Sequence, residues 1–126
     1  MTLSDRERVL YARQLLLSEV GPAGQARLFA ARAEPSCSAP DSEALAVARD
    51  YLTRAGLGRH ADQASKSVPI AVPATTTIEG LCKLPEHVPV ARALVGALCA
   101  VETLKATLEL GTPGPTLPTF SLSEEA

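Results

Sequence analysis

The side chains best suited to nucleophilic or metal chemistry are few in this sequence, and their spacing argues against both kinds of site. They are Cys37, Cys82, Cys99, His60 and His87. No two cysteines have the Cys-x-x-Cys spacing of a zinc site, and the histidines stand alone. Cys82 precedes the cation Lys83, but no base that could activate it lies nearby in the sequence. We therefore expect reduced thiols, no catalytic residue and no bound metal.

The carboxylates and arginines form no compact catalytic group in the sequence. Asp41 comes directly before a predicted helix, and Glu43 lies in its first turn. Acidic side chains are favourable there because they interact with the positive end of the helix dipole. We interpret them as helix N-terminal acids rather than as a catalytic pair. Arg49, Arg54 and Arg59 are spread along the chain and are expected on a solvated face.

Four helices are predicted from apolar spacing and terminal signals. Ser4 and Glu7 form a capping box, and Gly21-Pro22 separates the first helix from the second. Asp41 or Ser42 can cap the third helix, and Gly56 has the position of a left-handed C-terminal cap. The expected helices cover 4–18, 22–33, 42–55 and 89–110.

The remaining chain is poor in regular signals. Residues 60–88 are expected to be a proline-rich irregular segment, because Pro69 and Pro73 allow only a short edge strand. Residues 112–126 are expected to form a tail. The predicted fold is one small domain over 1–126, mainly α, with about four helices and little or no sheet. The alternative is a reduced α/β remnant of a Rossmann-like domain, with strands at 68–72 and 117–122.

Composition excludes several classes of function. The chain has 126 residues and a net charge of −2, which does not suit a nucleic-acid-binding protein. No apolar run approaches 18 residues, and the first residues lack the apolar segment of a secretory signal. We therefore expect a cytoplasmic protein that contacts neither nucleic acid nor membrane.

Three stretches resemble the ThiF/MoeB/HesA family of adenylyltransferases, which are related to ubiquitin-activating enzymes. The run from Leu10 to Leu17, followed by Val20-Gly21 and Gly24-Gln25, resembles the family's opening motifs. Residues 51–58 are similar to the end of its first crossover helix, and residues 96–105 to a late helix. The resemblance implies a Rossmann-like fold that binds ATP and Mg²⁺ and activates a ubiquitin-like or sulfur-carrier protein.

The sequence departs from the family where the nucleotide should bind. Family members carry a glycine-rich loop there, whose N–H groups approach the phosphates. This chain has no glycine between Ser36 and Ser42, and Pro40 removes an N–H donor. The predicted function is that of a catalytically inactive, truncated relative with no cofactor. The alternative is a minimal ATP-dependent adenylyltransferase.

An inactive relative would act through protein contacts, as a homodimer or as the partner of a full-length family member. The helices at 4–18 and 89–110 offer more apolar surface than a small core needs. The predicted interface residues are Leu10, Leu16, Leu94, Leu98, Val101 and Leu108. Arg13 matches the family arginine that reaches across a dimer to the partner's ATP, and the resemblance makes it a candidate trans-acting arginine.

Overall fold

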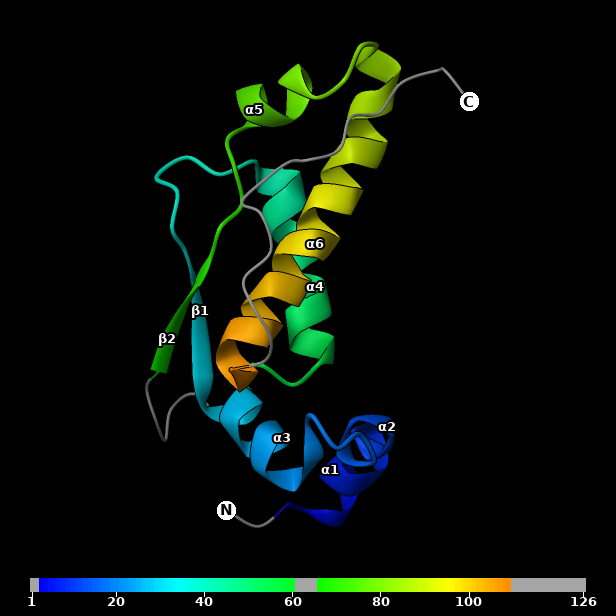
Figure 1. Ribbon diagram of the computed structural model, residues 1–126, viewed down its shortest axis with the longest axis vertical. Helices are drawn as coiled ribbons and strands as arrows, with labels where there is room; N and C mark the ends of the chain where they lie inside the picture. The colour runs from blue at the N-terminus through cyan, green and yellow to red at the C-terminus, as the bar shows by residue number, and fades with distance from the viewer. Residues whose placement is uncertain (1–2, 61–65, 110–126) are drawn as a thin grey trace.

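The computed structural model describes residues 3–60 and 66–109 and contains six α-helices and one pair of strands (Figure 1). In chain order the elements are α1 (Asp5–Leu10), α2 (Ala12–Leu15), α3 (Gly21–Ala30), β1 (Ala31–Pro35), α4 (Ser42–Arg54), β2 (Lys66–Ile70), α5 (Thr75–Gly80), the short 3₁₀ helix η1 (Pro85–His87) and α6 (Val88–Leu108). The fold is therefore mainly α, with a small sheet at one side of the helices.

The two strands run parallel and are joined through α4, which makes a β–α–β unit. Ala31 lies opposite Lys66, and the register continues to Pro35 opposite Ile70. In Figure 1, α4 and α6 both lie to one side of the strand pair. Parallel strands require such a crossover, because a tight turn cannot bring the chain back in the same direction.

Buried and exposed residues alternate along β2, and this pattern explains why the segment forms a strand although it contains a proline. Val68 and Ile70 are buried, while Lys66 and Pro69 are exposed. The carbonyl oxygen of Pro69 accepts a hydrogen bond from Thr103 Oγ1 on α6, at 3.3 Å. Since the N and O atoms of one strand residue point to the same side, the missing N–H of Pro69 faces away from β1. The proline therefore removes no bond between the strands.

The core lies where α4, α6 and β2 meet. Its buried side chains are mostly small or β-branched: Ala44, Ala48, Leu52, Ile70, Val72, Ile78, Ala91, Val95, Cys99 and Ala100. Among the described elements, α4 and α6 make the most extensive contact. At Gly96 a Cβ atom would stand 2.6 Å from the carbonyl oxygen of Ala44. Only glycine allows the two helices to approach so closely at this point.

Helices α1, α2 and α3 pack together at the other end of α4. Tyr11 interrupts the first helix, and its buried ring contacts the Phe29 ring edge-on, with centroids 5.1 Å apart. Phe29 also lies against the turn after α4, where Gly56 has a φ of +95°. The predicted capping box of Ser4 and Glu7 and the left-handed conformation of Gly56 are both confirmed.

The expectation of about four helices with little or no sheet is wrong. The predicted helix over 4–18 is divided into α1 and α2, and the predicted helix over 22–33 ends at Ala30, where β1 begins. Residues 60–88 contain β2, α5 and η1 rather than irregular chain alone. Of the alternative's strands, β2 overlaps 68–72, while 117–122 lies outside the described residues. The tail at 112–126 lies outside them as well.

Candidate functional site

The carboxyl ends of β1 and β2 are the place where a β–α–β unit can hold a phosphate. In open α/β folds, ligands bind beyond the carboxyl ends of the strands, at the N-terminus of the following helix. Here the chain leaves β1 at Pro35 and enters α4 at Ser42, with Asp41 as the N-terminal cap. The side chains around Asp41 therefore decide what this end of the molecule can bind.

The carboxylate of Asp41 is buried and fully hydrogen-bonded. One oxygen accepts the Ala44 N–H at 2.9 Å. The other accepts from Thr75 Oγ1 at 2.7 Å and from Arg92 Nε at 3.0 Å. Only 2% of the residue's surface is exposed. Three elements, α4, α5 and α6, thus converge on one carboxyl group.

The ionised form of Asp41 is favoured in this setting. Burial raises the pKa of the carboxyl, but the hydrogen bonds from Ala44, Thr75 and Arg92 and the charge of Arg92 outweigh that effect. The net result is a pKa below the usual range of an aspartate. The same pairing raises the pKa of the Arg92 guanidinium. The pair is therefore charged at neutral pH.

Asp41 occupies the N-terminus of α4, which is the position where a nucleotide phosphate would bind. The Ala44 N–H, the Thr75 hydroxyl and the Arg92 guanidinium are donors that could hold an anion, and all three already bond to Asp41. An incoming phosphate would also meet the charge of Glu43, which lies 3.5 Å from Arg92 Nη1. The residues present therefore do not fit ATP with Mg²⁺ at this end.

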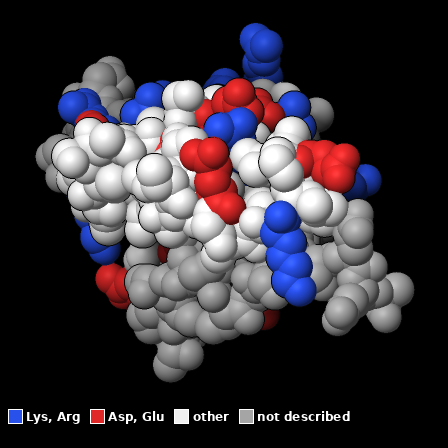
Figure 2. Space-filling view, turned by 90° about the horizontal axis from the view of Figure 1, so that it is seen from above, with Lys and Arg blue, Asp and Glu red and all other residues white. Residues whose placement is uncertain are grey.

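Charge on the surface around this end gives no compensating attraction for a phosphate. Figure 2 looks down on the molecule from the side toward which the strands point, and it shows acidic and basic side chains close to one another. No broad field of positive charge is visible on the described part of this face. Mixed charges of this kind cancel at short range and steer a polyanion only weakly.

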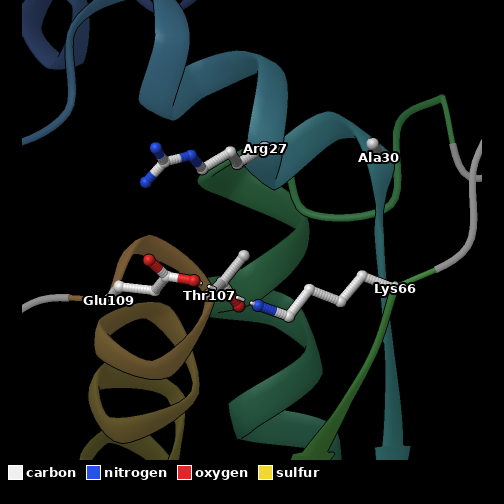
Figure 3. Close-up of a pocket in the computed structure, with 5 residues that line it drawn as sticks. All are labelled: Arg27, Ala30, Lys66, Thr107 and Glu109. Atoms are coloured by element: carbon white, nitrogen blue, oxygen red, sulfur yellow. Dashed lines mark ion pairs between the residues drawn. The ribbon is translucent and has the colours of Figure 1, made fainter.

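The opposite end of the strands carries a shallow hollow of about 270 Å³ (Figure 3). It is lined by Arg27, Ala30, Lys66, Thr107 and Glu109. Arg27 donates to the carbonyl oxygen of Leu108 at 3.4 Å, and the Lys66 ammonium lies 3.6 Å from Glu109 Oε1. The charged side chains of the hollow are thus partly engaged with the protein itself. It also lies at the amino ends of the strands, away from the usual ligand position.

A second buried carboxylate, Glu7, ties α1 to the turn after α4. It accepts from the Ser4 N–H at 3.0 Å, from Arg59 Nε at 3.1 Å and lies 2.8 Å from His60 Nε2. Its pKa is lowered, chiefly by the hydrogen bond from Ser4 and against the opposing effect of burial, with further contributions from Arg59 and His60. Arg59 and Tyr11 are also in contact, with Arg59 Nη1 3.5 Å from the Tyr11 hydroxyl. The cluster acts as a tether between distant parts of the chain.

This tether could not be read from the sequence. The capping box gives a local reason for Glu7, and nothing in the spacing places it beside residues 59 and 60. Arg59, expected on a solvated face, contacts Glu7, and so does His60, which stands alone in the sequence. Gly56 and Gly58, which both adopt a positive φ, mark the turn that brings the chain back toward α3.

The thiols of Cys82 and Cys99 have different surroundings. Cys99 is buried, its Sγ lies 3.5 Å from the carbonyl oxygen of Ala71, and burial raises the pKa of its thiol. Cys82 is half-buried and contacts the carbonyl oxygen of Ile78 at 3.6 Å. Within residues 3–60 and 66–109 no three metal-binding side chains come together.

The predicted interface residues divide into two exposed groups and one buried residue. Leu10 and Leu16 are exposed around α1 and α2, while Leu94, Leu98 and Val101 are exposed on α6. Leu108 differs from the expectation, because it is buried against Gly24 of α3 and only 7% exposed. Arg13 is exposed on α2, and no hydrogen bond or ion pair joins it to the described residues.

One segment of the described chain, Pro85–Leu108, is long and apolar enough to cross a membrane. The expectation that no segment would meet this criterion is therefore corrected. Core helices of soluble proteins meet it as well, and about one third of the relevant window is buried inside the protein. One face of α6 packs against α4 and β2, as a core helix does.

Comparisons with known proteins give no relative. A scan against models of protein families found no match, and searches of curated proteins and of solved structures found no significant one.

Proposed function

We propose that this chain is a catalytically inactive relative of the ThiF/MoeB/HesA adenylyltransferases that works through protein contacts. The observation that carries the proposal is the position of Asp41. Its buried carboxylate takes the donors that a nucleotide phosphate would need, at the N-terminus of the crossover helix. A protein with this site filled from within is suited to binding other proteins rather than ATP.

The β–α–β unit supports the proposed relationship. Strand β1, helix α4 and strand β2 follow one another as in the first unit of nucleotide-binding α/β folds. The stretches that resemble the family fall on α1 to α3, on the end of α4 and on α6. Agreement of this kind is an analogy of fold, and it carries no function by itself.

The exposed apolar side chains support the proposed mode of action. Leu94, Leu98 and Val101 on α6 are each about half exposed, and Leu16 beside α2 is 86% exposed. Exposed apolar side chains gathered on one face of a helix, as on α6, are typical of protein interaction sites. We propose a cytoplasmic protein whose partner is a second copy of itself or a full-length family member.

A calorimetric titration with ATP and Mg²⁺ tests the inactive state directly. We expect no binding heat with the full chain at about 50 µM and ATP up to about 1 mM. Magnesium chloride alone and ATP with an unrelated protein are the controls. Binding at micromolar affinity would contradict the proposal and favour a minimal adenylyltransferase.

Arg13 gives a second test, in which the chain serves the site of another protein. Because the side chain is exposed, it could reach the ATP phosphates of a full-length relative. If so, the chain should stimulate pyrophosphate exchange by that relative, and Arg13→Ala should reduce the stimulation about 10- to 1,000-fold. Arg8→Ala, on neighbouring α1, is the matched control. Equal stimulation by Arg13→Ala would remove the arginine from the proposal.

A further inference from the structure

The first two helices present an outward side on which arginines and aliphatic residues alternate. Residues that follow one another at intervals of three and four positions lie on the same side of a helix. Six exposed residues of α1, α2 and the turn after them have this spacing: Arg6, Val9, Leu10, Arg13, Leu16 and Leu17. Their four aliphatic side chains are exposed by between 52 and 86%. We call these six residues the N-terminal face.

Backbone hydrogen bonds keep the helical repeat across Tyr11, where α1 ends and α2 begins. The Tyr11 N–H donates to the carbonyl oxygen of Glu7 at 3.0 Å, and the Leu15 N–H donates to that of Tyr11 at 3.0 Å. Glu7 and Tyr11 lie on the other side of the segment, and both are buried. The segment is therefore amphipathic, with one side packed on the protein and the N-terminal face directed to solvent.

The arginines of the N-terminal face have no counter-charge in the part of the chain that the structure describes. No hydrogen bond or ion pair joins Arg6 or Arg13 to those residues. The acid in the middle of α1, Glu7, is turned inward and is already paired with Arg59. The face is therefore locally positive, although the whole chain has a net charge of −2.

The surface of an anionic lipid bilayer fits this face better than the surface of a protein. Aromatic anchors dominate many protein contacts, but Tyr11, the aromatic residue of this segment, is buried. Arg13 lies along the face between the aliphatic pairs 9–10 and 16–17. A long arginine side chain can keep its stem among apolar groups while its guanidinium reaches a lipid phosphate. Basic amphipathic helices of this kind are typical of membrane surfaces.

We propose that the N-terminal face docks the folded chain on an anionic phospholipid bilayer. The aliphatic side chains enter the boundary between headgroups and acyl chains, and the arginines bind the lipid phosphates. α1 and α2 lie at one end of the longest axis of the molecule, where a flat surface can reach them (Figure 1). The inference goes beyond the proposed function, since it concerns where the chain is held. It also departs from the expectation drawn from net charge, which averages opposite charges over the whole surface.

Docking through this face leaves the fold intact, whereas spanning of a bilayer by α6 would not. α6 carries Arg92 in an ion pair with Asp41, and it packs against α4 and β2. Insertion of α6 would separate these contacts and place charged groups in hydrocarbon at a high cost. The residues of the N-terminal face already lie on the surface, so the bilayer can contact them without such a rearrangement.

Co-sedimentation of the full chain with lipid vesicles tests the docking. We expect binding to phosphatidylcholine vesicles that contain about 40% phosphatidylserine, and binding about tenfold weaker to phosphatidylcholine alone. Raising NaCl from about 50 to about 500 mM should weaken binding to the anionic vesicles about five- to tenfold, because salt screens the attraction. No binding to the anionic vesicles, or equal binding to the two kinds, would overturn the proposal.

A substitution of one leucine tests the apolar part of the contact. Leu16→Ser should weaken binding to the anionic vesicles about tenfold, because the inserted side chain loses its favourable transfer from water. Leu98→Ser is the matched control, since Leu98 is exposed on α6 and should leave the binding unchanged. Equal weakening by the two variants, or weakening by Leu98→Ser alone, would overturn the assignment to the N-terminal face.

A charge reversal tests the basic part of the contact. Arg13→Glu should weaken binding to the anionic vesicles about 10- to 30-fold, because an attraction becomes a repulsion. Arg8→Glu makes the same change on α1, but five residues away, about 140° around the helix. This control should weaken binding less than about threefold. Equal weakening by Arg8→Glu and Arg13→Glu would overturn the assigned face.

Two further measurements separate the docking from folding and from the proposed function. The four substituted side chains are exposed, so each variant should keep the circular dichroism spectrum of the wild type. Self-association that Leu16→Ser abolishes, in a chain that binds no anionic vesicles, would assign the face to a protein partner and overturn the docking. Heat with ATP from a chain that binds these vesicles would contradict only the proposed function.

Discussion

The two ends of the strand pair differ in the burial of their charged side chains. At the carboxyl ends, Asp41 is buried and bonded to α4, α5 and α6 at 2.7–3.0 Å. At the amino ends, Lys66 and Glu109 face each other across 3.6 Å, and their side chains are 60% and 71% exposed. The first end is closed by an internal ion pair, while the second remains an open hollow.

This difference shows how a β–α–β unit can fill the carboxyl ends of its strands with its own side chains. Closing the carboxyl ends takes one acidic residue at the helix cap and one arginine on the neighbouring helix. The Asp41–Arg92 pair then joins α4 to α6 and contributes to the stability of their packing. The hollow at the other end contributes little to the core, since its charged groups remain hydrated.

The largest expected effect comes from forcing α4 and α6 apart, which would disrupt the closed end. In Gly96→Ala the new Cβ would stand 2.6 Å from the Ala44 carbonyl oxygen and 2.8 Å from the Val47 Cβ. We expect the free energy of unfolding to fall by about 3 kcal/mol, the upper range for overpacking. Urea unfolding measures the change. Gly80→Ala is the matched control, because its Cβ would meet no atom within 4 Å.

Removal of the carboxylate itself should have the next largest effect. Asp41→Ala deletes the cap of α4 and removes the buried acceptor that Thr75 and Arg92 share, so we expect a loss of about 2 kcal/mol. Glu43→Ala removes another acid that contacts Arg92, but from a side chain that is 67% exposed. The control should change stability by less than about 0.5 kcal/mol. Equal losses in the two variants would refute the assigned role of Asp41.

The pH dependence of stability should show the contribution of the same carboxylate without a substitution. Since the folded pKa of Asp41 is lowered, its stabilisation is present above the pKa of about 3.9 in the unfolded chain and is lost as the pH falls below it. Glu7 contributes in the same sense. Urea midpoints measured between about pH 6 and 3 should fall for the wild type and fall less steeply for Asp41→Ala. Identical slopes would show that the pKa of Asp41 does not differ between the folded and the unfolded chain.

The smallest effect is expected at the open end. Lys66→Ala removes the ion pair with Glu109, whose two side chains are largely exposed. We expect a change of less than about 0.5 kcal/mol in the free energy of unfolding. A loss as large as that of Asp41→Ala would mean that the two ends are equivalent, contrary to the comparison.

The sequence predicts the N-termini of the helices well because their signals are local. Asp41 acts as the cap that its position suggests, and Ser4 and Glu7 form the expected capping box. Strand β1 was missed because pairing decides it, while β2 overlaps the strand at 68–72 that only the alternative fold contained. Ala31–Pro35 has little strand propensity, and it becomes a strand by lying beside residues 66–70.

The sequence also predicted only part of the candidate site. Asp41 could be recognised as a helix N-terminal acid, but its bonds to Thr75 and Arg92 cross 34 and 51 residues of chain. Leu108 looked like part of an exposed stripe, and the close approach of α3 buries it. Apolar spacing identifies a helix face, while only the tertiary fold decides whether that face is covered.

Cys99 gives the chain a built-in chemical reporter. Its thiol is buried between α6 and the segment after β2, with Sγ 3.5 Å from the Ala71 carbonyl oxygen. A reagent can reach it only when α6 moves away from that segment, whereas Cys37 and Cys82 are half-buried in the folded protein. Because thiolates are the reactive form, the raised pKa of Cys99 slows alkylation further. The rate at which the third thiol is modified therefore measures how often the core opens, with no foreign label introduced.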